Sequence, residues 1–226
     1  MLFEIRPGPV PGSMGRRWLD VPDADKEEAK RVGAKWDPDE QRWYAGPGGS
    51  AHLERWSPRP DLPMELPGED IRYGQGLFVD LIPASARWTH ARSCIGGRDW
   101  LRVQRLVRSR AQNTCEPCHR QTAAAIRTEI HERWEYDLAA RVQRLRQLVC
   151  LCPDCHTTTH FGYARVRGVD RQAFNHLCEV TGMSAVEGAR HLREAFDLWE
   201  QRSRIQRDLD LSILTDARIE IVRPGC

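Results

Sequence analysis

Two Cys-x-x-Cys pairs limit what this chain can fold into more than any other feature of its sequence. Cys115 and Cys118 form the first pair, and Cys152 and Cys155 form the second. Each pair bends the backbone so that two thiolates point at one ion, and four thiolates complete the closed tetrahedron of a structural zinc site. The pattern therefore predicts one zinc ion that joins two distant segments of the chain.

The setting of the cysteines favours metal ligands or free thiols over disulfides. The first residues lack the basic-then-apolar layout of a secretory signal, and no apolar run is long enough to span a bilayer. We therefore expect a cytoplasmic protein without membrane contact, in which disulfides are disfavoured. Hydrophobic residues make up 40% of the chain and charged residues 29%, and these fractions are those of an ordinary soluble globular protein.

Three histidines near the cysteine pairs predict more than a structural zinc site. His156 directly follows Cys155, and His160 lies about one helical turn further along a helix that is predicted to start near Cys155. His131 lies on a predicted short strand between the two pairs. Because the zinc ion would tie that strand to the helix, three imidazoles can converge on a second, open metal position. The other histidines are predicted to be exposed or structural: His52, His90, His119, His176 and His191.

The segment from about Phe78 to Leu214 resembles a bacterial family of HNH endonucleases. The resemblance is carried by a helix around Trp100 and by the motifs CEPC, EIHERWEYD, LCPDCHTTTHFG, EAFDLWEQRS and LDLS, in that order. It implies a ββα-metal fold that cuts phosphodiester bonds with one divalent ion and a general base. The ion would be Mg, Mn, Ni or Zn, held by His156, His160 and His131, and His156 would contribute to catalysis.

The sequence departs from the HNH pattern at two places. The family has a metal ligand followed by a basic histidine on the first strand, whereas this chain has His131 followed by Glu132. Either His131 is the ligand and Glu132 the base, or His131 is the base and Ile130 occupies the ligand position, where it cannot serve. The middle Asn of the family falls at Gln147, which retains an amide. Glu129 lies on the same strand face as His131 and is predicted to orient it.

Charge is distributed unevenly along the chain. Acidic residues outnumber basic ones by thirteen to nine over residues 14–70, whereas basic residues outnumber acidic ones by thirteen to six over residues 87–148. A basic segment next to an acidic one is typical of a protein with one nucleic-acid-binding part, or of two differently solvated surfaces. In the first case the helix around Trp100 would grip DNA phosphates through three arginines, Arg102, Arg105 and Arg108.

Residues 16–47 form a separate small unit. A short strand at 18–21, a helix from Asp23 to about Arg31 ended by Gly33, and a hairpin between Trp36 and Trp43 are predicted. Its aromatic residues form either a base-stacking platform or the core of the unit. The unit resembles a small bacterial domain of unknown function that accompanies plasmid and DNA-metabolism proteins, on the motifs WLDVP, GAKWD and WYAGP.

These observations predict an α+β protein with three parts. Residues 14–47 form a small β-α-β-β accessory domain, residues 48–76 a Pro- and Gly-rich linker, and residues 77–214 a zinc-stabilised HNH core embedded in helices. The predicted function is that of a metal-dependent DNA endonuclease in defence against foreign DNA or in a mobile element, as a homodimer or with a partner protein of a defence system. The alternatives are a catalytically silent zinc module that binds DNA or a partner, and an interaction protein without a nucleic-acid role.

Overall fold

The computed structural model describes residues 15–49, 51–86, 90–121 and 128–222. The chain divides into two compact units, with the boundary between Pro60 and Asp61. Within the described residues, no helix is both long and apolar enough to cross a bilayer. The described part of the chain is a mixed α+β structure with two small sheets.

The first unit is a three-stranded antiparallel sheet with one helix. The order of the strands in the sheet is β1-β3-β2, and the elements are β1 (Arg17–Leu19), α1 (Lys26–Arg31), β2 (Lys35–Asp37), β3 (Arg42–Ala45) and the 3-10 helix η2 (Ala51–Trp56). The predicted β-α-β-β order is confirmed. A 3-10 turn, η1 (Asp23–Asp25), precedes α1, so the α-helix begins later than predicted. Gly33 follows the helix with a φ of 101°, a conformation that glycine adopts without strain.

The core of the first unit extends beyond the predicted domain end. Trp43 is buried, and Leu53 and Trp56 of η2 pack with it in the same cluster. Trp36, by contrast, is 47% exposed, so the aromatic residues are divided between core and surface. The predicted linker at 48–76 therefore begins with residues that belong to this core.

The second unit contains a long β-hairpin flanked by helices. Its elements are η3 (Ala84–Ala86), α2 (Ala91–Cys94), α3 (Gly97–Arg110), β4 (Glu129–Asp137), β5 (Val142–Leu151), α4 (Pro153–Thr159), α5 (Phe161–Val166), α6 (Asp170–Thr181), α7 (Ala185–Ser203), β6 (Asp208–Asp210) and α8 (Ser212–Thr215). Strands β4 and β5 are antiparallel, with a β-bulge between Arg133 and Trp134, and β6 joins β5 in parallel. The sheet order β4-β5-β6 places β4 at an edge.

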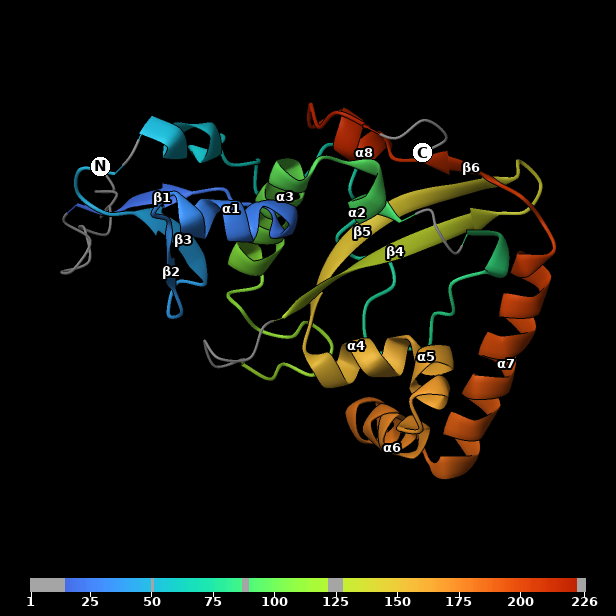
Figure 1. The fold of residues 1–226 in the computed structure, drawn as a ribbon. Helices are drawn as coiled ribbons and strands as arrows, with labels where there is room; N and C mark the ends of the chain where they lie inside the picture. Colours follow the sequence, from blue (N-terminus) through green and yellow to red (C-terminus); the bar gives the residue numbers. More distant parts are fainter. Residues whose placement is uncertain (1–14, 50, 87–89, 122–127, 223–226) are drawn as a thin grey trace, which may run out of the picture. The chain divides into compact units, whose positions relative to one another are not determined.

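Helices lie on both faces of this hairpin (Figure 1), and each face has its own hydrophobic core. Helices α2, α3 and α8 cover one face, where Trp100, Val103 and Leu106 of α3 form the buried stripe that their helical spacing predicts. Helices α4, α5 and α6 cover the other face, and α7 runs beside them with Ala195 buried. Alternate residues of β4 therefore face different cores.

The second half of the predicted linker is part of the second unit. Leu62 and Leu66 are buried in the core on the α3 side. Glu69 accepts hydrogen bonds from the guanidinium of Arg110, at 2.7 and 2.8 Å, and from the backbone N–H of Leu148, at 3.0 Å. Residues 48–76 are thus shared between the two units, although their Pro and Gly content predicts irregular backbone correctly.

Candidate metal centres

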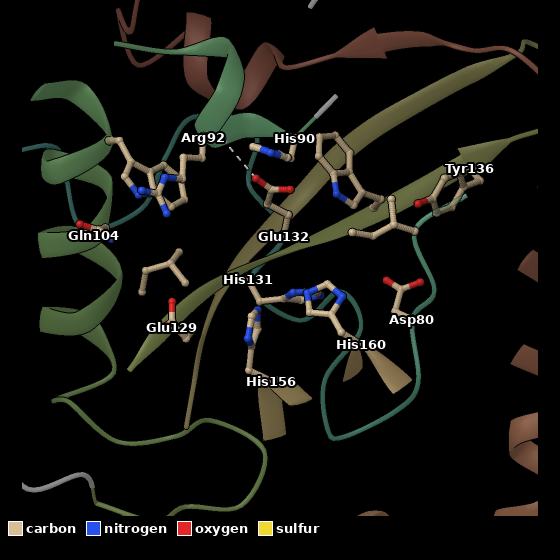
Figure 2. Close-up of a pocket in the computed structure, with 14 residues that line it drawn as sticks. Asp80, His90, Arg92, Gln104, Glu129, His131, Glu132, Tyr136, His156 and His160 are labelled. Carbon is tan, nitrogen blue, oxygen red and sulfur yellow. Dashed lines mark hydrogen bonds between the residues drawn. The ribbon is translucent and has the colours of Figure 1, made fainter. Parts of the chain in front are cut away.

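Three histidines from β4 and α4 form a compact cluster (Figure 2). One ring nitrogen from each of His131, His156 and His160 lies within 4.8 Å of the others. His156 and His160 come together because the backbone N–H of His160 donates to the carbonyl of His156, at 3.0 Å, across one turn at the end of α4. The predicted convergence of these three side chains is present in the structure.

The surroundings of the cluster suit a metal ion. Nε2 of His131 is buried and has no hydrogen-bond partner within the part of the chain that is described. Burial lowers the pKa of His131 and of His156, and lowers the pKa of His160 to about 3. The imidazoles are therefore neutral near pH 7, which is the form that binds metal ions. A buried nitrogen lone pair or N–H without a partner is costly, and an ion coordinated there would remove that cost.

A pocket of about 190 Å³ adjoins the histidines and extends around the free edge of β4. Residues from both faces of the strand line it, because neighbouring strand residues point to opposite sides. Its lining also includes Asp80, Ile82, His90, Arg92, Trp100, Gln104, Glu129, Ile130, Glu132, Trp134 and Tyr136.

Glu132 lies on the opposite face of β4 from the histidine cluster but lines the same pocket (Figure 2). Its carboxylate accepts a hydrogen bond from the backbone N–H of Arg92, at 3.4 Å, so it contacts the start of α2. Burial raises the pKa of Glu132 to about 7, although hydrogen bonds to the carboxylate oppose the rise. Ile130 is buried in the core on the α3 side. It offers no donor to a metal ion, and the choice between the two sequence registers stays a prediction.

The two residues expected to support the site lie elsewhere or act differently. The side-chain amide of Gln147 donates to the backbone carbonyl of Ile71, at 2.9 Å. It therefore anchors the irregular segment around Ile71, and not a loop that carries the general base. Glu129 is exposed at the pocket, and its charge opposes the lowering of the pKa of His156. Its charge thus acts on His156 rather than on His131.

The three arginines predicted to grip phosphates have partners within the chain. Arg102 pairs with Asp99 at 2.9 Å, and Arg105 pairs with Asp61 at 3.1 Å. The third arginine of the helix, Arg108, donates to the backbone carbonyl of Thr128, at 3.0 Å. These contacts stabilise α3 and its neighbours, so the structure favours a structural role for this basic stripe.

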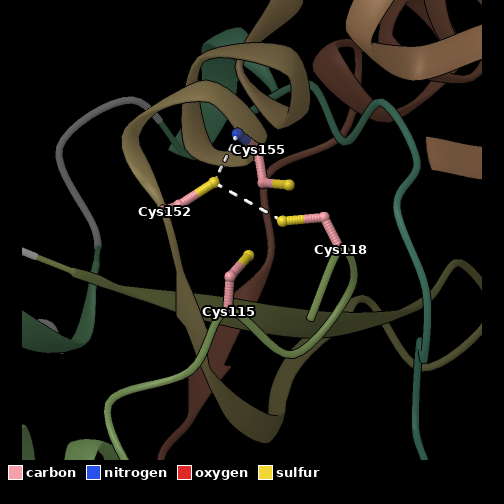
Figure 3. Close-up of side chains that lie close together, drawn as sticks. All are labelled: Cys115, Cys118, Cys152 and Cys155. Carbon is pink, nitrogen blue, oxygen red and sulfur yellow. Dashed lines mark hydrogen bonds between the residues drawn. The ribbon is translucent and has the colours of Figure 1, made fainter. Parts of the chain in front are cut away.

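Four cysteines form a second cluster (Figure 3). Their sulfur atoms lie within 4.8 Å of one another and come from Cys115, Cys118, Cys152 and Cys155. Cys152 caps the N-terminus of α4, where its sulfur accepts from the backbone N–H of Cys155, at 3.5 Å. Four buried or half-buried thiols can hold a metal ion, and thiolates are the ligands that zinc prefers in closed structural sites. The predicted grouping of these cysteines is confirmed.

Helix α4 joins the two clusters, since it carries Cys155 and His156 as neighbours. A further contact reaches the cysteines from α6, where Nε2 of His176 lies 3.2 Å from Sγ of Cys155. The sequence predicts His176 only as an exposed or structural histidine, because no spacing connects it to the cysteines. Cys94, which belongs to neither cluster, is disulfide-bonded, contrary to the expectation that disulfides are disfavoured.

Sequence reasoning missed several residues that line the pocket. The side chain of Asp80 is 12% exposed, and burial raises the pKa of its carboxyl group. Gln104 lies one helical turn after Trp100 on α3 and lines the pocket with it. Tyr136 lies within the EIHERWEYD motif of β4, but it is not among the site residues predicted from that motif. The alternation of β4 and the helical spacing of α3 were visible in the sequence, but their juxtaposition was not.

Comparisons with known proteins match the first unit. Residues 16–58 match the family model "Domain of unknown function (DUF5710)". This confirms the predicted resemblance of the N-terminal unit and extends it beyond residue 47. The DNA primase TraC of Escherichia coli is 42% identical over 43 residues, which are 19% of this chain and 3% of the primase. No solved structure matches the chain. The HNH resemblance of the second unit stays a prediction.

Proposed function

We propose that the second unit is a metal-dependent endonuclease that hydrolyses DNA phosphodiester bonds. The observation that supports it most is the cluster of His131, His156 and His160 beside a pocket, on a strand and a helix that follow the order of the HNH motif. Three protein ligands leave a coordination position open for substrate or water, unlike the four cysteines nearby. Two sites with different ligand sets would thus divide structural and catalytic roles.

The residues of the site would act as follows. His131, His156 and His160 would hold a divalent ion, which supplies stabilisation of the negative charge on the phosphate and on the leaving 3′ oxygen. Glu132 would accept the proton from the attacking water, because the imidazole of His131 would be a ligand of the metal ion. Cys115, Cys118, Cys152 and Cys155 would bind zinc and fix α4 against the first cysteine loop.

The first unit would direct this activity to DNA. The relative matched there is named a DNA primase, and it shares only the short N-terminal segment. A role for DUF5710 in contacting DNA or a DNA-bound partner is consistent with that name. In the same setting, the whole chain would act on foreign DNA or on a mobile element.

A silent DNA- or partner-binding module is the second candidate. It is favoured by the hydrogen bond that the Glu132 carboxylate accepts from the backbone N–H of Arg92, because this bond occupies an oxygen of the proposed general base. The intramolecular contacts of Arg102, Arg105 and Arg108 also reduce the cationic surface available to a duplex.

Plasmid cleavage by the purified full chain separates the two candidates. Supercoiled DNA is incubated with Mg²⁺, Mn²⁺, Ni²⁺ or a chelator, beside a His156→Ala variant and a His119→Ala control. His119 is exposed and lies outside the cluster. Metal-dependent nicking that is lost in His156→Ala and retained in His119→Ala supports the nuclease. No cleavage with any metal by folded, zinc-containing protein supports the silent module.

A further inference from the structure

The pocket has a second lobe on the α3 side of β4. Trp100 and Gln104 of α3 form one wall, and Ile130 and Trp134 of β4 form the opposite one. The histidine cluster lies on the other face of the strand, so the two lobes meet around the edge of β4. A ligand that occupies both would bend around this edge.

This lobe contains a buried hydrogen-bond donor without a partner. Trp100 is only 8% exposed, and its Nε1 has no hydrogen-bond partner among the residues that the structure describes. Buried indole N–H groups normally find an acceptor, and leaving one unpaired is costly. Gln104 lies one helical turn further on the same wall, is 6% exposed and brings both donors and an acceptor (Figure 2).

The chemistry of the walls selects a flat, neutral ligand with a polar edge. Aromatic and aliphatic side chains dominate both walls, and the indole N–H and the amide supply the polar contacts. The carboxyl group of Glu132 also lines the pocket on this side, and in its ionised form it would repel a phosphate placed in this lobe. The volume of about 190 Å³ belongs to the whole pocket and is smaller than that of typical drug-sized sites, so the lobe on the α3 side has room for no more than one heterocycle.

We propose that this lobe binds a single nucleobase that has left the stack of its strand. Trp100 Nε1 and the Gln104 amide would hydrogen-bond to the edge of the base, while the attached phosphate reaches the histidines around the edge of β4. The proposal deepens the proposed function, on which its link to cleavage rests. It follows that unpaired or distorted DNA is preferred over an intact duplex, because extracting a base from a duplex costs stacking and pairing free energy.

Binding of 2-aminopurine oligonucleotides tests the lobe separately from cleavage. The full chain is titrated, without added divalent ion, into a single strand carrying one 2-aminopurine and into the matching duplex. Trp100→Phe removes the N–H and keeps an aromatic ring. Trp43→Phe is the matched control, because the Nε1 of Trp43 is also buried without a partner but lies in the core of the first unit. Gln104→Leu is a second variant that keeps the lobe testable if Trp100→Phe does not fold.

The proposal predicts tighter binding of the single strand than of the duplex, with a change in 2-aminopurine fluorescence. Trp100→Phe and Gln104→Leu should each weaken single-strand binding about three- to tenfold, the range expected for one hydrogen bond, and Trp43→Phe should not. Equal affinities for single strand and duplex, no binding, or equal effects of Trp100→Phe and Trp43→Phe would overturn it. If DNA is still cleaved when the binding results contradict the base lobe, the proposed nuclease function stands. If the base binds but no DNA is cleaved, only the nuclease proposal is refuted.

Discussion

Glu69→Ala is expected to destabilise the second unit by about 3–5 kcal/mol. The Glu69 side chain is 0% exposed and binds the guanidinium of Arg110, which is itself only 14% exposed. Removing the carboxylate deprives that buried charge of its ion-pair partner and leaves the backbone N–H of Leu148 without this acceptor. Since Leu148 lies opposite Glu132 in the β4–β5 register, the change also loosens the strand behind the proposed active site.

Urea unfolding of the full chain, followed by far-UV circular dichroism, measures this loss. The control is Glu200→Ala, whose pair with Arg204 is exposed at both ends and should contribute less than about 1 kcal/mol. Replacing Glu69 and Arg110 together with leucine should recover much of the stability, because no unpaired charge then remains. A Glu69→Ala loss no larger than that of Glu200→Ala would refute the reasoning and the inclusion of residue 69 in the second unit.

Three further changes test the metal centres. His176→Phe should weaken zinc binding about 10- to 100-fold, because hydrogen bonds to metal ligands tune the affinity for the metal. Competition with a chromophoric chelator measures this affinity, and an unchanged value would show that His176 does not support the zinc site. Cys155→Ser should lower the zinc content per chain and the stability of the second unit, which elemental analysis and thermal melts measure; full zinc content would contradict the four-cysteine site. Glu132→Gln should slow plasmid cleavage about 100-fold or more while metal binding persists, and wild-type cleavage would exclude it as the base.

The two side-chain clusters could be predicted from the sequence because their spacing is local. A Cys-x-x-Cys pair and two histidines one turn apart have few possible geometries, whatever surrounds them. Placing His131 with the latter two needed only the assumption that the cysteines join the strand to the helix. The cysteine and histidine clusters of the structure agree with both steps.

Long-range packing explains what the sequence did not reveal. The Pro- and Gly-rich composition of residues 48–76 indicates irregular backbone, but it does not show that Trp56 is buried in one unit and Glu69 in the other. The helical stripe of arginines around Arg105 predicts an exposed basic face. The partners of Arg105 and Arg108, however, are Asp61 and Thr128, which come from segments that no local pattern connects to α3.

The placement of Glu132 could be predicted from the sequence only in part. Strand alternation alone separates it from His131, since adjacent residues point to opposite faces of β4. Its contact with Arg92 and the shared pocket depend on where α2 packs, which the sequence does not specify. Only the three-dimensional structure therefore reveals that one pocket extends around the edge of β4.

The most direct test of the account measures metal binding at the histidines and DNA cleavage in the same titration. Zinc-containing protein is titrated with Mn²⁺ or Ni²⁺, and calorimetry and plasmid nicking are followed over the same concentrations. We expect one further ion per chain, half-maximal cleavage at the concentration that half-saturates this site, and loss of both in His160→Ala. Cleavage that persists in His160→Ala, or a bound ion at the histidines that supports no cleavage of any DNA, would contradict it.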